Sequence, residues 1–184
     1  MRADAEAGSG AGDLAARVRE AALLEGDFVL SSGKRSRFYV DKYLFSTEPE
    51  LLGELAGELA RRLPADTERL AGVELGAVPL AAAVSLATGL PYVIVRKGVK
   101  EHGASAGKGV EGRLEAGEKV VLVEDVVTTG TQVLKAAAVL EGVGAEIQKV
   151  VAVLDRRGDG SPRLGGHPFE ALLGIEDMGV GGGD

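Results

Sequence analysis

Three stretches of the chain are apolar almost from end to end, and a polar segment follows each. They read PYVIVR at 91–96, KVVLVED at 119–125 and KVVAVLD at 149–155. Continuous apolar runs of this length are typical of strands that are covered on both faces of a parallel sheet. Together with two weaker runs, they predict strands near 70–75, 91–96, 119–124, 147–154 and 169–175.

Helical patterns alternate with these strands. An alanine-rich stretch predicts a helix at 79–88 that Gly89 ends, and a second helix is predicted at 130–141. Strands that alternate with helices indicate right-handed βαβ units. We therefore predict an α/β fold in which a parallel sheet is flanked by helices.

The N-terminal part has a different pattern, which predicts a small cap ahead of the sheet. DLAARVREAALL predicts a helix at 13–24 with Asp13 as its N-cap, and residues 28–43 read as two short strands around a polar turn at 31–36. A capping box of Thr47 and Glu50 then precedes another helix. One apolar stripe of leucines marks that helix, at Leu51, Leu55, Leu59 and Leu63.

The chain length indicates one domain. We expect a disordered tail at 1–12, a domain at 13–175 with a cap at 13–47 and a core at 48–175, and a flexible tail at 176–184.

Composition narrows the classes of protein that the chain can belong to. The 184 residues contain no cysteine, which excludes disulfides and thiolate metal sites, and carry a net charge of −7. An acidic chain is a poor general binder of nucleic acid, so an anion site must be local. No apolar run reaches the roughly 18 residues that span a membrane, and the N-terminus does not read as a secretory signal. We expect a cytoplasmic protein without a nucleic-acid or membrane partner.

Charged residues gather where the predicted strands end. Arg96, Glu124, Asp125 and Asp155 all follow apolar runs, and ligands of parallel sheets bind beyond the carboxyl ends of the strands. A carboxylate in mid-strand would be buried at a large cost, so we expect both Glu124 and Asp125 to be solvated at a strand end. There they can accept hydrogen bonds from a vicinal diol or hold Mg²⁺ through water.

The sequence that follows the two acids suits a phosphate. The segment TTGT at 128–131 leads into the helix predicted from about Gly130, and backbone N–H groups at a helix N-terminus bind anions. Acids for a diol and a loop for a phosphate together describe a site for ribose 5-phosphate. The alternative is a solvated strand end with an ordinary N-cap.

The whole stretch VVLVEDVVTTGT at 120–131 resembles the phosphoribosyl pyrophosphate signature of the type I phosphoribosyltransferases. The resemblance implies that fold, a parallel sheet flanked by helices with a small N-terminal cap or hood. It also implies that Glu124 and Asp125 bind the ribose hydroxyls. The residues implied for the 5-phosphate are Val126, Val127, Thr128, Thr129, Gly130 and Thr131.

A basic segment resembles one branch of that family. RKGVKEHG at 96–103 is similar to the mobile loop of the orotate phosphoribosyltransferases. The resemblance implies that the loop at 97–117 closes over the active site of the neighbouring subunit in a homodimer, and that Lys100, His102 and Asp125 are catalytic. It implies a phosphoribosyl pyrophosphate clamp formed by Arg96, Lys97, Lys100 and His102. The alternative is a solvated loop.

Two further stretches resemble the same branch and concern the base. FVLSSGKRSRFYVDKY at 28–43 is similar to the segment that contacts orotate, and VLDRRGDG at 153–160 places an arginine where the family binds the orotate carboxylate. The orotate contacts implied are Ser32, Gly33, Lys34, Thr128 and Arg156. One departure is that ELGAVP at 74–79, where the family meets pyrophosphate, lacks the lysine that many members have.

These resemblances imply that orotate and phosphoribosyl pyrophosphate give orotidine 5′-phosphate and pyrophosphate, a step of pyrimidine (UMP) biosynthesis. They also imply Mg²⁺, which enters with the substrate and for which Asp125 is a candidate contact. Two alternatives stay open. One is a phosphoribosyltransferase for another base, and the other is a non-catalytic regulator that senses phosphoribosyl pyrophosphate and binds nucleic acid.

Overall fold

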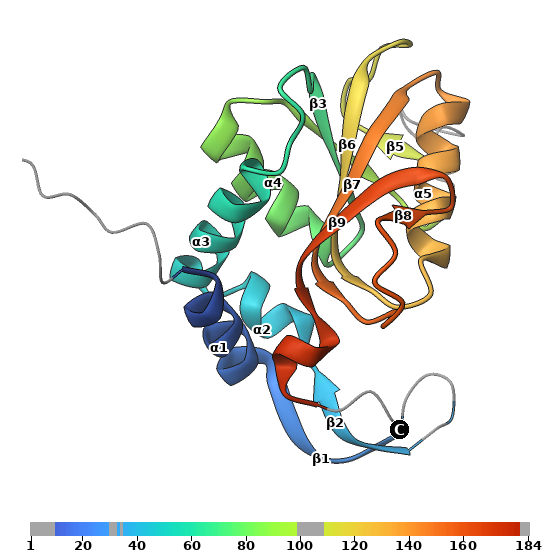
Figure 1. The fold of residues 1–184 in the computed structure, drawn as a ribbon. Helices are drawn as coiled ribbons and strands as arrows, with labels where there is room; N and C mark the ends of the chain where they lie inside the picture. Colours follow the sequence, from blue (N-terminus) through green and yellow to red (C-terminus); the bar gives the residue numbers. More distant parts are fainter. Residues whose placement is uncertain (1–9, 30–32, 34, 99–108, 181–184) are drawn as a thin grey trace, which may run out of the picture.

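A seven-stranded sheet forms the centre of the computed structural model, which describes residues 10–29, 33, 35–98 and 109–180. Figure 1 shows the sheet, whose strand order is β5-β4-β3-β6-β7-β9-β8. Its strands are β3 (Arg69–Val73), β4 (Tyr92–Val95), β5 (Val110–Glu111), β6 (Lys119–Val127), β7 (Glu146–Asp155), β8 (Arg163–Leu164) and β9 (His167–Gly174). The five strands from β4 to β9 in this order pair in parallel, and β5 and β8 add antiparallel edges.

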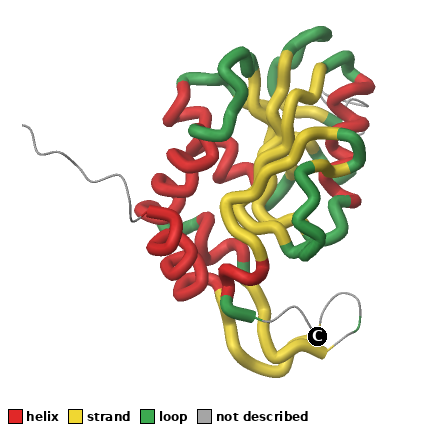
Figure 2. The backbone as a smooth tube through the Cα atoms, viewed as in Figure 1, coloured by secondary structure: helices red, strands yellow, loops and turns green. Residues whose placement is uncertain are grey.

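Helices cover both faces of the sheet, as Figures 1 and 2 show. On one face lie α1 (Gly10–Ala22), α2 (Lys42–Ser46), α3 (Pro49–Ala60) and α4 (Ala77–Thr88), and on the other lies α5 (Thr131–Gly142). The predicted parallel sheet flanked by helices is confirmed. No helix among the described residues is both long enough and apolar enough to cross a membrane.

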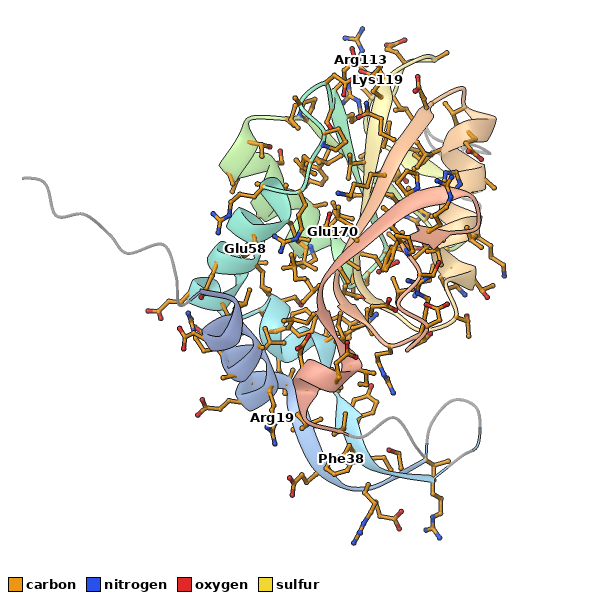
Figure 3. The ribbon with its side chains drawn as sticks, viewed as in Figure 1. Arg19, Phe38, Glu58, Arg113, Lys119 and Glu170 are labelled. Carbon is orange, nitrogen blue, oxygen red and sulfur yellow. The ribbon has the colours of Figure 1, made fainter. Side chains whose placement is uncertain are left out.

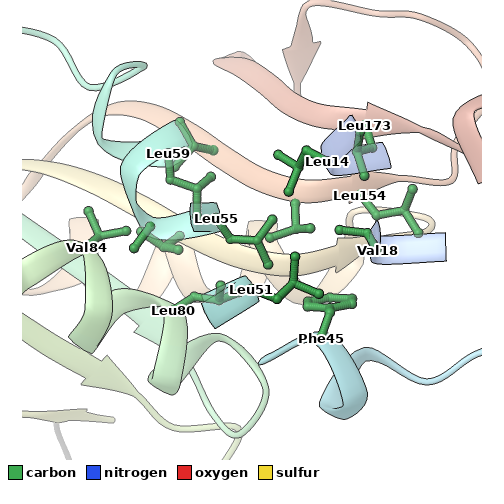
Figure 4. Close-up of a cluster of buried hydrophobic side chains, with 14 of the residues drawn as sticks. Leu14, Val18, Phe45, Leu51, Leu55, Leu59, Leu80, Val84, Leu154 and Leu173 are labelled. Atoms are coloured by element: carbon green, nitrogen blue, oxygen red, sulfur yellow. The ribbon is translucent and has the colours of Figure 1, made fainter. Parts of the chain in front are cut away.

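Alternation along β6 produces a separate hydrophobic core on each face. Val121 and Val123 pack with leucines of α3 and α4, whereas Val120 and Leu122 pack on the α5 side. The first core, part of which Figure 4 shows, also receives Leu14, Val18 and Phe45 from the N-terminal elements. A strand with apolar residues at every position needs a cover on both faces, and the two cores provide it.

The N-terminal cap contains a hairpin that projects from the body of the protein (Figure 1). Strands β1 (Leu23–Val29) and β2 (Arg35–Val40) pair antiparallel, and the rings of Phe28 and Tyr39 lie 5.5 Å apart across them. The two predicted short strands are confirmed, although Ser36, which was expected in the turn, belongs to β2.

The predicted capping box of Thr47 and Glu50 is wrong. Thr47 ends the short helix α2, where its Oγ1 donates a hydrogen bond of 2.6 Å to the carbonyl of Tyr43. Helix α3 begins two residues later at Pro49, and its N-cap residue Glu48 makes no capping bond through its side chain. Because α2 uses Thr47, the proline that follows starts the next helix instead.

Several element ends also differ from the prediction. Helix α1 begins at Gly10, inside the stretch that was expected to be a tail. At the other end, a 3₁₀ helix η1 (Ile175–Met178) continues the packed chain, and the side chain of Met178 is fully buried in the first core. The prediction therefore places the start of the C-terminal tail too early, because residues 176–178 belong to η1.

Candidate active site

A cavity of about 320 Å³ lies at the carboxyl ends of β3, β6 and β7, where the sheet meets the N-terminal cap. Parallel strands direct their carboxyl ends to one edge, so residues that are distant in sequence meet there. The residues that line it are Tyr39, Val40, Lys42, Val73, Glu74, Gly76, Lys97, Glu124, Asp125, Val126, Thr128, Gln132 and Arg156.

The two adjacent acids are buried, contrary to the expectation that they are solvated. Glu124 is 6% exposed and Asp125 is 1% exposed. The reason is that β6 does not end there but continues to Val127, which pairs with Asp155 of β7. One oxygen of each carboxyl group accepts a hydrogen bond from the backbone. Glu124 Oε1 accepts from the N–H of Asp125, and Asp125 Oδ1 accepts from the N–H of Val126.

Burial changes the charge of this acid pair. Loss of hydration, and then the charge of Asp125 and its hydrogen bond, raise the pKa of Glu124 to about 8. Two adjacent carboxylates in a poorly hydrated place cannot both ionise easily. Burial and the neighbouring acid thus favour the protonated form of Glu124.

Lys42 of α2 contacts the acid pair, although its place in the sequence gave no indication of this. Its Nζ lies 2.7 Å from Oδ2 of Asp125, in an ion pair rather than a well-directed hydrogen bond. Burial lowers the pKa of Lys42, but the contact with Asp125 and the charge of Glu124 outweigh it and leave that pKa above its usual value. The lysine stays charged beside the carboxylate.

Gly76, which precedes α4, lets the chain pass directly over Asp125. A Cβ atom at this position would overlap Oδ2 of Asp125 and would lie 3.1 Å from Cε of Lys42. No side chain fits between this loop and the acid pair, so the backbone of the loop forms one wall of the cavity.

The segment TTGT at 128–131 leads into α5 as expected. Gly130 is the N-cap, with a left-handed φ of 75°, and a Cβ atom there would overlap the side chain of Leu164. Thr128 and Thr129 are exposed ahead of the helix, and the hydroxyls of Thr129 and Thr131 lie 2.9 Å apart. Backbone N–H groups at a helix N-terminus, with hydroxyls beside them, are suited to an anion.

The two arginines after β7 have different surroundings. Arg156 lines the cavity, and its N–H donates a 2.8 Å hydrogen bond to the carbonyl of Val127 at the end of β6. The side chain of Arg157 is only 8% exposed and binds both carboxylate oxygens of Asp155. It also donates to the carbonyl of Ser161 and stacks on the ring of Phe169, 4.3 Å away. Arg157 thus holds the turn together while Arg156 faces the cavity.

Arg96 and Lys97, the described basic residues that follow β4, lie at or beside the cavity and contact acidic side chains. Nη1 of Arg96 lies 3.6 Å from Glu111 and its Nε lies 4.0 Å from Glu74, which also accepts a 2.5 Å hydrogen bond from the N–H of Lys97. Lys97 lines the cavity, whereas Arg96 lines an adjoining groove.

Some predicted site residues are not brought to the cavity by the described structure. Gly33 is exposed and is not among the residues that line it. Ser32, Lys34, Lys100 and His102 lie outside the described residues.

The donor set of the cavity fits a Mg²⁺ ion that arrives with a phosphorylated ligand. Within the described ranges, no group of three or more His, Cys, Asp or Glu side chains is placed to hold a metal ion. Mg²⁺ usually binds one or two carboxylates together with substrate phosphates and water. Asp125, whose shielded Oδ2 lacks a well-directed hydrogen bond, is the group that suits this.

Comparison with known proteins identifies the family. The model of the phosphoribosyl transferase domain matches residues 49–166. An orotate phosphoribosyltransferase of Halobacterium salinarum is 45% identical over 169 residues, which cover 90% of this chain and 95% of that protein. The chain belongs to the orotate phosphoribosyltransferase family.

Solved structures of orotate phosphoribosyltransferases agree with this. One from Mycobacterium tuberculosis, in complex with Fe(III) dicitrate, has a TM-score of 0.80 and 30% identity, and the match covers 94% of this chain and 100% of that one. The same enzyme in complex with 5-phospho-α-D-ribosyl 1-diphosphate has a TM-score of 0.73 over the same shares of the two chains. The family and the type I phosphoribosyltransferase fold predicted from the sequence are confirmed, and the roles of single residues stay predictions.

Proposed function

We propose that the protein transfers the 5-phosphoribosyl group of phosphoribosyl pyrophosphate to orotate, giving orotidine 5′-phosphate and pyrophosphate for UMP biosynthesis. Membership of the orotate phosphoribosyltransferase family supports this. The observation that carries it is one cavity lined by the acid pair Glu124 and Asp125, by Thr128 and by Arg156. These groups suit a diol, a phosphate and a carboxylate.

The sugar donor is held by groups from β6 and the start of α5. The carboxyl groups of Asp125 and Glu124 accept hydrogen bonds from the ribose hydroxyls, and the raised pKa of Glu124 favours a protonated form that can also donate one. The 5-phosphate lies against the N–H groups and hydroxyls from Val126 to Thr131, at the positive end of α5.

During the reaction, the bond between C1 of the ribose and the diphosphate oxygen breaks, and the diphosphate keeps the electron pair. N1 of orotate bonds to C1, and the proton that N1 loses ends on the departing diphosphate. The developing negative charge needs cations that are already in place, because such preorganised groups lower the barrier most. When bound, Mg²⁺ supplies further neutralisation of the diphosphate, and Asp125 is the carboxylate that would hold it.

The basic loop serves the leaving group. Lys97 already lines the cavity, and Arg96 lies next to it. We assign protonation or shielding of the departing oxygen to Lys100 or His102, as the family resemblance implies. General acid catalysis of this kind typically contributes about 10²–10⁴-fold to the rate.

Orotate differs from uracil by its carboxylate, and Arg156 is suited to read that group. A guanidinium binds a carboxylate with two parallel hydrogen bonds. The backbone of Arg156 is tied to β6 through Val127, so its side chain emerges next to the sugar site. We propose that Ser32, Gly33, Lys34 and Thr128 complete the contacts with the ring.

We further propose a cytoplasmic homodimer in which the loop at 97–117 acts in the partner's active site. Family membership and the basic residues of this loop support the proposal. Exposed apolar side chains on and near the cap, namely Val29, Tyr39, Tyr43 and Leu44, offer a surface for a second subunit.

The experiment that tests the function compares bases. Purified protein with phosphoribosyl pyrophosphate and Mg²⁺ should consume orotate, should slow strongly when Mg²⁺ is chelated, and should not use uracil or hypoxanthine at a comparable rate. A preference for hypoxanthine would indicate a purine enzyme. Absence of turnover with any base, together with salt-dependent binding of RNA or DNA, would indicate a regulator.

A further inference from the structure

The loop between β3 and α4 faces the cavity without a positive charge. Its residues from Glu74 to Gly76 contain one acid and no base. Glu74 contacts Arg96 and the backbone of Lys97, and Arg96 also faces Glu111. A diphosphate that leaves over this loop therefore needs a cation from another element.

Of the described residues that line the cavity, Lys42, Lys97 and Arg156 are cationic. The proposed function uses Arg156 for the base, and Lys97 begins the basic loop. Lys42 is different, because it comes from the cap and reaches over the acid pair. Its Cε lies 3.1 Å from the position that a Cβ atom of Gly76 would occupy, so Lys42 lies directly beside the loop that has no base.

The chemistry of the sugar places the diphosphate near Lys42. The hydroxyl on C2 of ribose is a neighbour of C1, to which the diphosphate is attached. If Asp125 or Glu124 binds that hydroxyl, a cation 2.7 Å from Asp125 is within reach of the group on C1. A lysine has a flexible four-carbon stem, which allows its ammonium group to move by a few ångströms.

We infer that Lys42 binds the diphosphate of the sugar donor and that its ion pair with Asp125 is the resting position of this cation. This inference rests on the proposed function. When the sugar binds, its hydroxyl takes the place of the ammonium group at Asp125, and Lys42 turns to the diphosphate beside Gly76. The exchange leaves neither the carboxylate nor the ammonium group buried without a partner, which would be costly.

A purely structural role for Lys42 makes a different prediction. If the lysine only neutralises Asp125, its loss should disturb every ligand of the acid pair equally. If it binds the diphosphate, its loss should weaken ligands that carry this group and should spare ribose 5-phosphate, which lacks it.

The test is calorimetric titration of the full chain, at fixed Mg²⁺, with phosphoribosyl pyrophosphate and separately with ribose 5-phosphate. Lys42→Met should weaken binding of phosphoribosyl pyrophosphate roughly 10- to 100-fold, the effect of one lost hydrogen bond between charged groups. The same variant should bind ribose 5-phosphate within about twofold of the parent, and Lys42→Arg should keep most of the affinity for phosphoribosyl pyrophosphate.

Lys119→Met is the matched control. Lys119 carries the same charge as Lys42 but is the first residue of β6, at the end of the strand opposite Asp125, where it pairs with Asp66. Figure 3 shows that Lys119 lies far from Phe38, a residue of the N-terminal cap that also carries Lys42. Lys119→Met should bind both ligands as the parent does. Lys42→Gln replaces Lys42→Met if thermal unfolding shows that the methionine variant does not fold.

Parent-like binding of phosphoribosyl pyrophosphate by Lys42→Met would overturn the inference, as would an equal loss for both ligands. The proposed function fails in a different way, through absence of orotate turnover in the parent protein itself.

Discussion

Gly76 lies against Asp125 so closely that a Cβ atom at position 76 would come within 2.9 Å of the carboxyl carbon and would overlap Oδ2. Its φ and ψ of −67° and −31° suit any residue, so the need for glycine is steric. We predict that Gly76→Ala displaces Asp125, costs about 1–3 kcal/mol of stability and raises the Michaelis constant for the sugar donor. Steady-state kinetics and thermal unfolding measure the two effects.

Gly53→Ala is the control for this substitution. Gly53 is exposed in the middle of α3, and a Cβ atom there would meet nothing within 4 Å. Alanine at this position should stabilise the protein by about 0.5–1 kcal/mol and leave the kinetics unchanged. A Gly76→Ala enzyme with parental kinetics would mean that the acid pair does not need its observed position.

The raised pKa of Glu124 predicts a pH dependence of stability. Glu124 has a pKa of about 8 in the folded protein, whereas a free glutamate has a pKa of 4.5. The contribution of this proton to the free energy of unfolding is therefore complete below pH 4.5 and is lost as the pH rises to 8. Glu124→Gln cannot lose a proton. Its free energy of unfolding, relative to that of the parent, should therefore increase between pH 5 and pH 8.5, as urea titrations at several pH values can show. Parallel pH curves for the two proteins would contradict a proton on Glu124.

The apolar runs were sufficient to predict the sheet, because β6 and β7 are hydrophobic on both faces and no other arrangement covers them. The same pattern could not show that the acids are buried. Their burial depends on the pairing of Val127 with Asp155, a contact between strands that the sequence of β6 does not contain.

Lys42 was missed for a similar reason. Helix α2 has five residues, too few for a helical period to be visible, so VDKY was interpreted as the end of a hairpin. The contact between Lys42 and Asp125 joins the cap to the sheet, and only the fold brings these residues together. By contrast, Thr128 and Arg156 were accessible to sequence reasoning because they directly follow long strands.

Arg157 offers a test of how Arg156 is held. We predict that Arg157→Met leaves the partly buried Asp155 without its partner and destabilises the protein by about 1–3 kcal/mol. The turn that carries Arg156 should loosen, so the Michaelis constant should rise more for orotate than for the sugar donor.

The double variant Arg157→Met with Asp155→Asn is the companion experiment, because it leaves no unpaired charge. It should recover part of the stability but not the affinity for orotate. Full recovery of both would show that the guanidinium contacts with Ser161 and Phe169 are unimportant.

The proposed loop in trans predicts complementation between inactive proteins. Lys100→Ala and Asp125→Asn should each be nearly inactive alone. If Lys100 serves the partner's site, subunits mixed under exchange conditions should recover activity, because a hybrid dimer contains one site with both groups intact. Unchanged inactivity, with hybrid dimers demonstrated by native mass spectrometry, would rule out action in trans.

The central claim is that one cavity recognises the sugar through Asp125 and the base through Arg156. The most direct measurement is the Michaelis constant of each substrate in Asp125→Asn and Arg156→Ala. We predict a crossed result, in which Asp125→Asn mainly raises the constant for phosphoribosyl pyrophosphate and Arg156→Ala mainly raises that for orotate. Arg156→Lys should recover only part of the loss, because an ammonium group cannot form two parallel hydrogen bonds. Equal changes for both substrates in both variants, or parental constants in either, would contradict the claim.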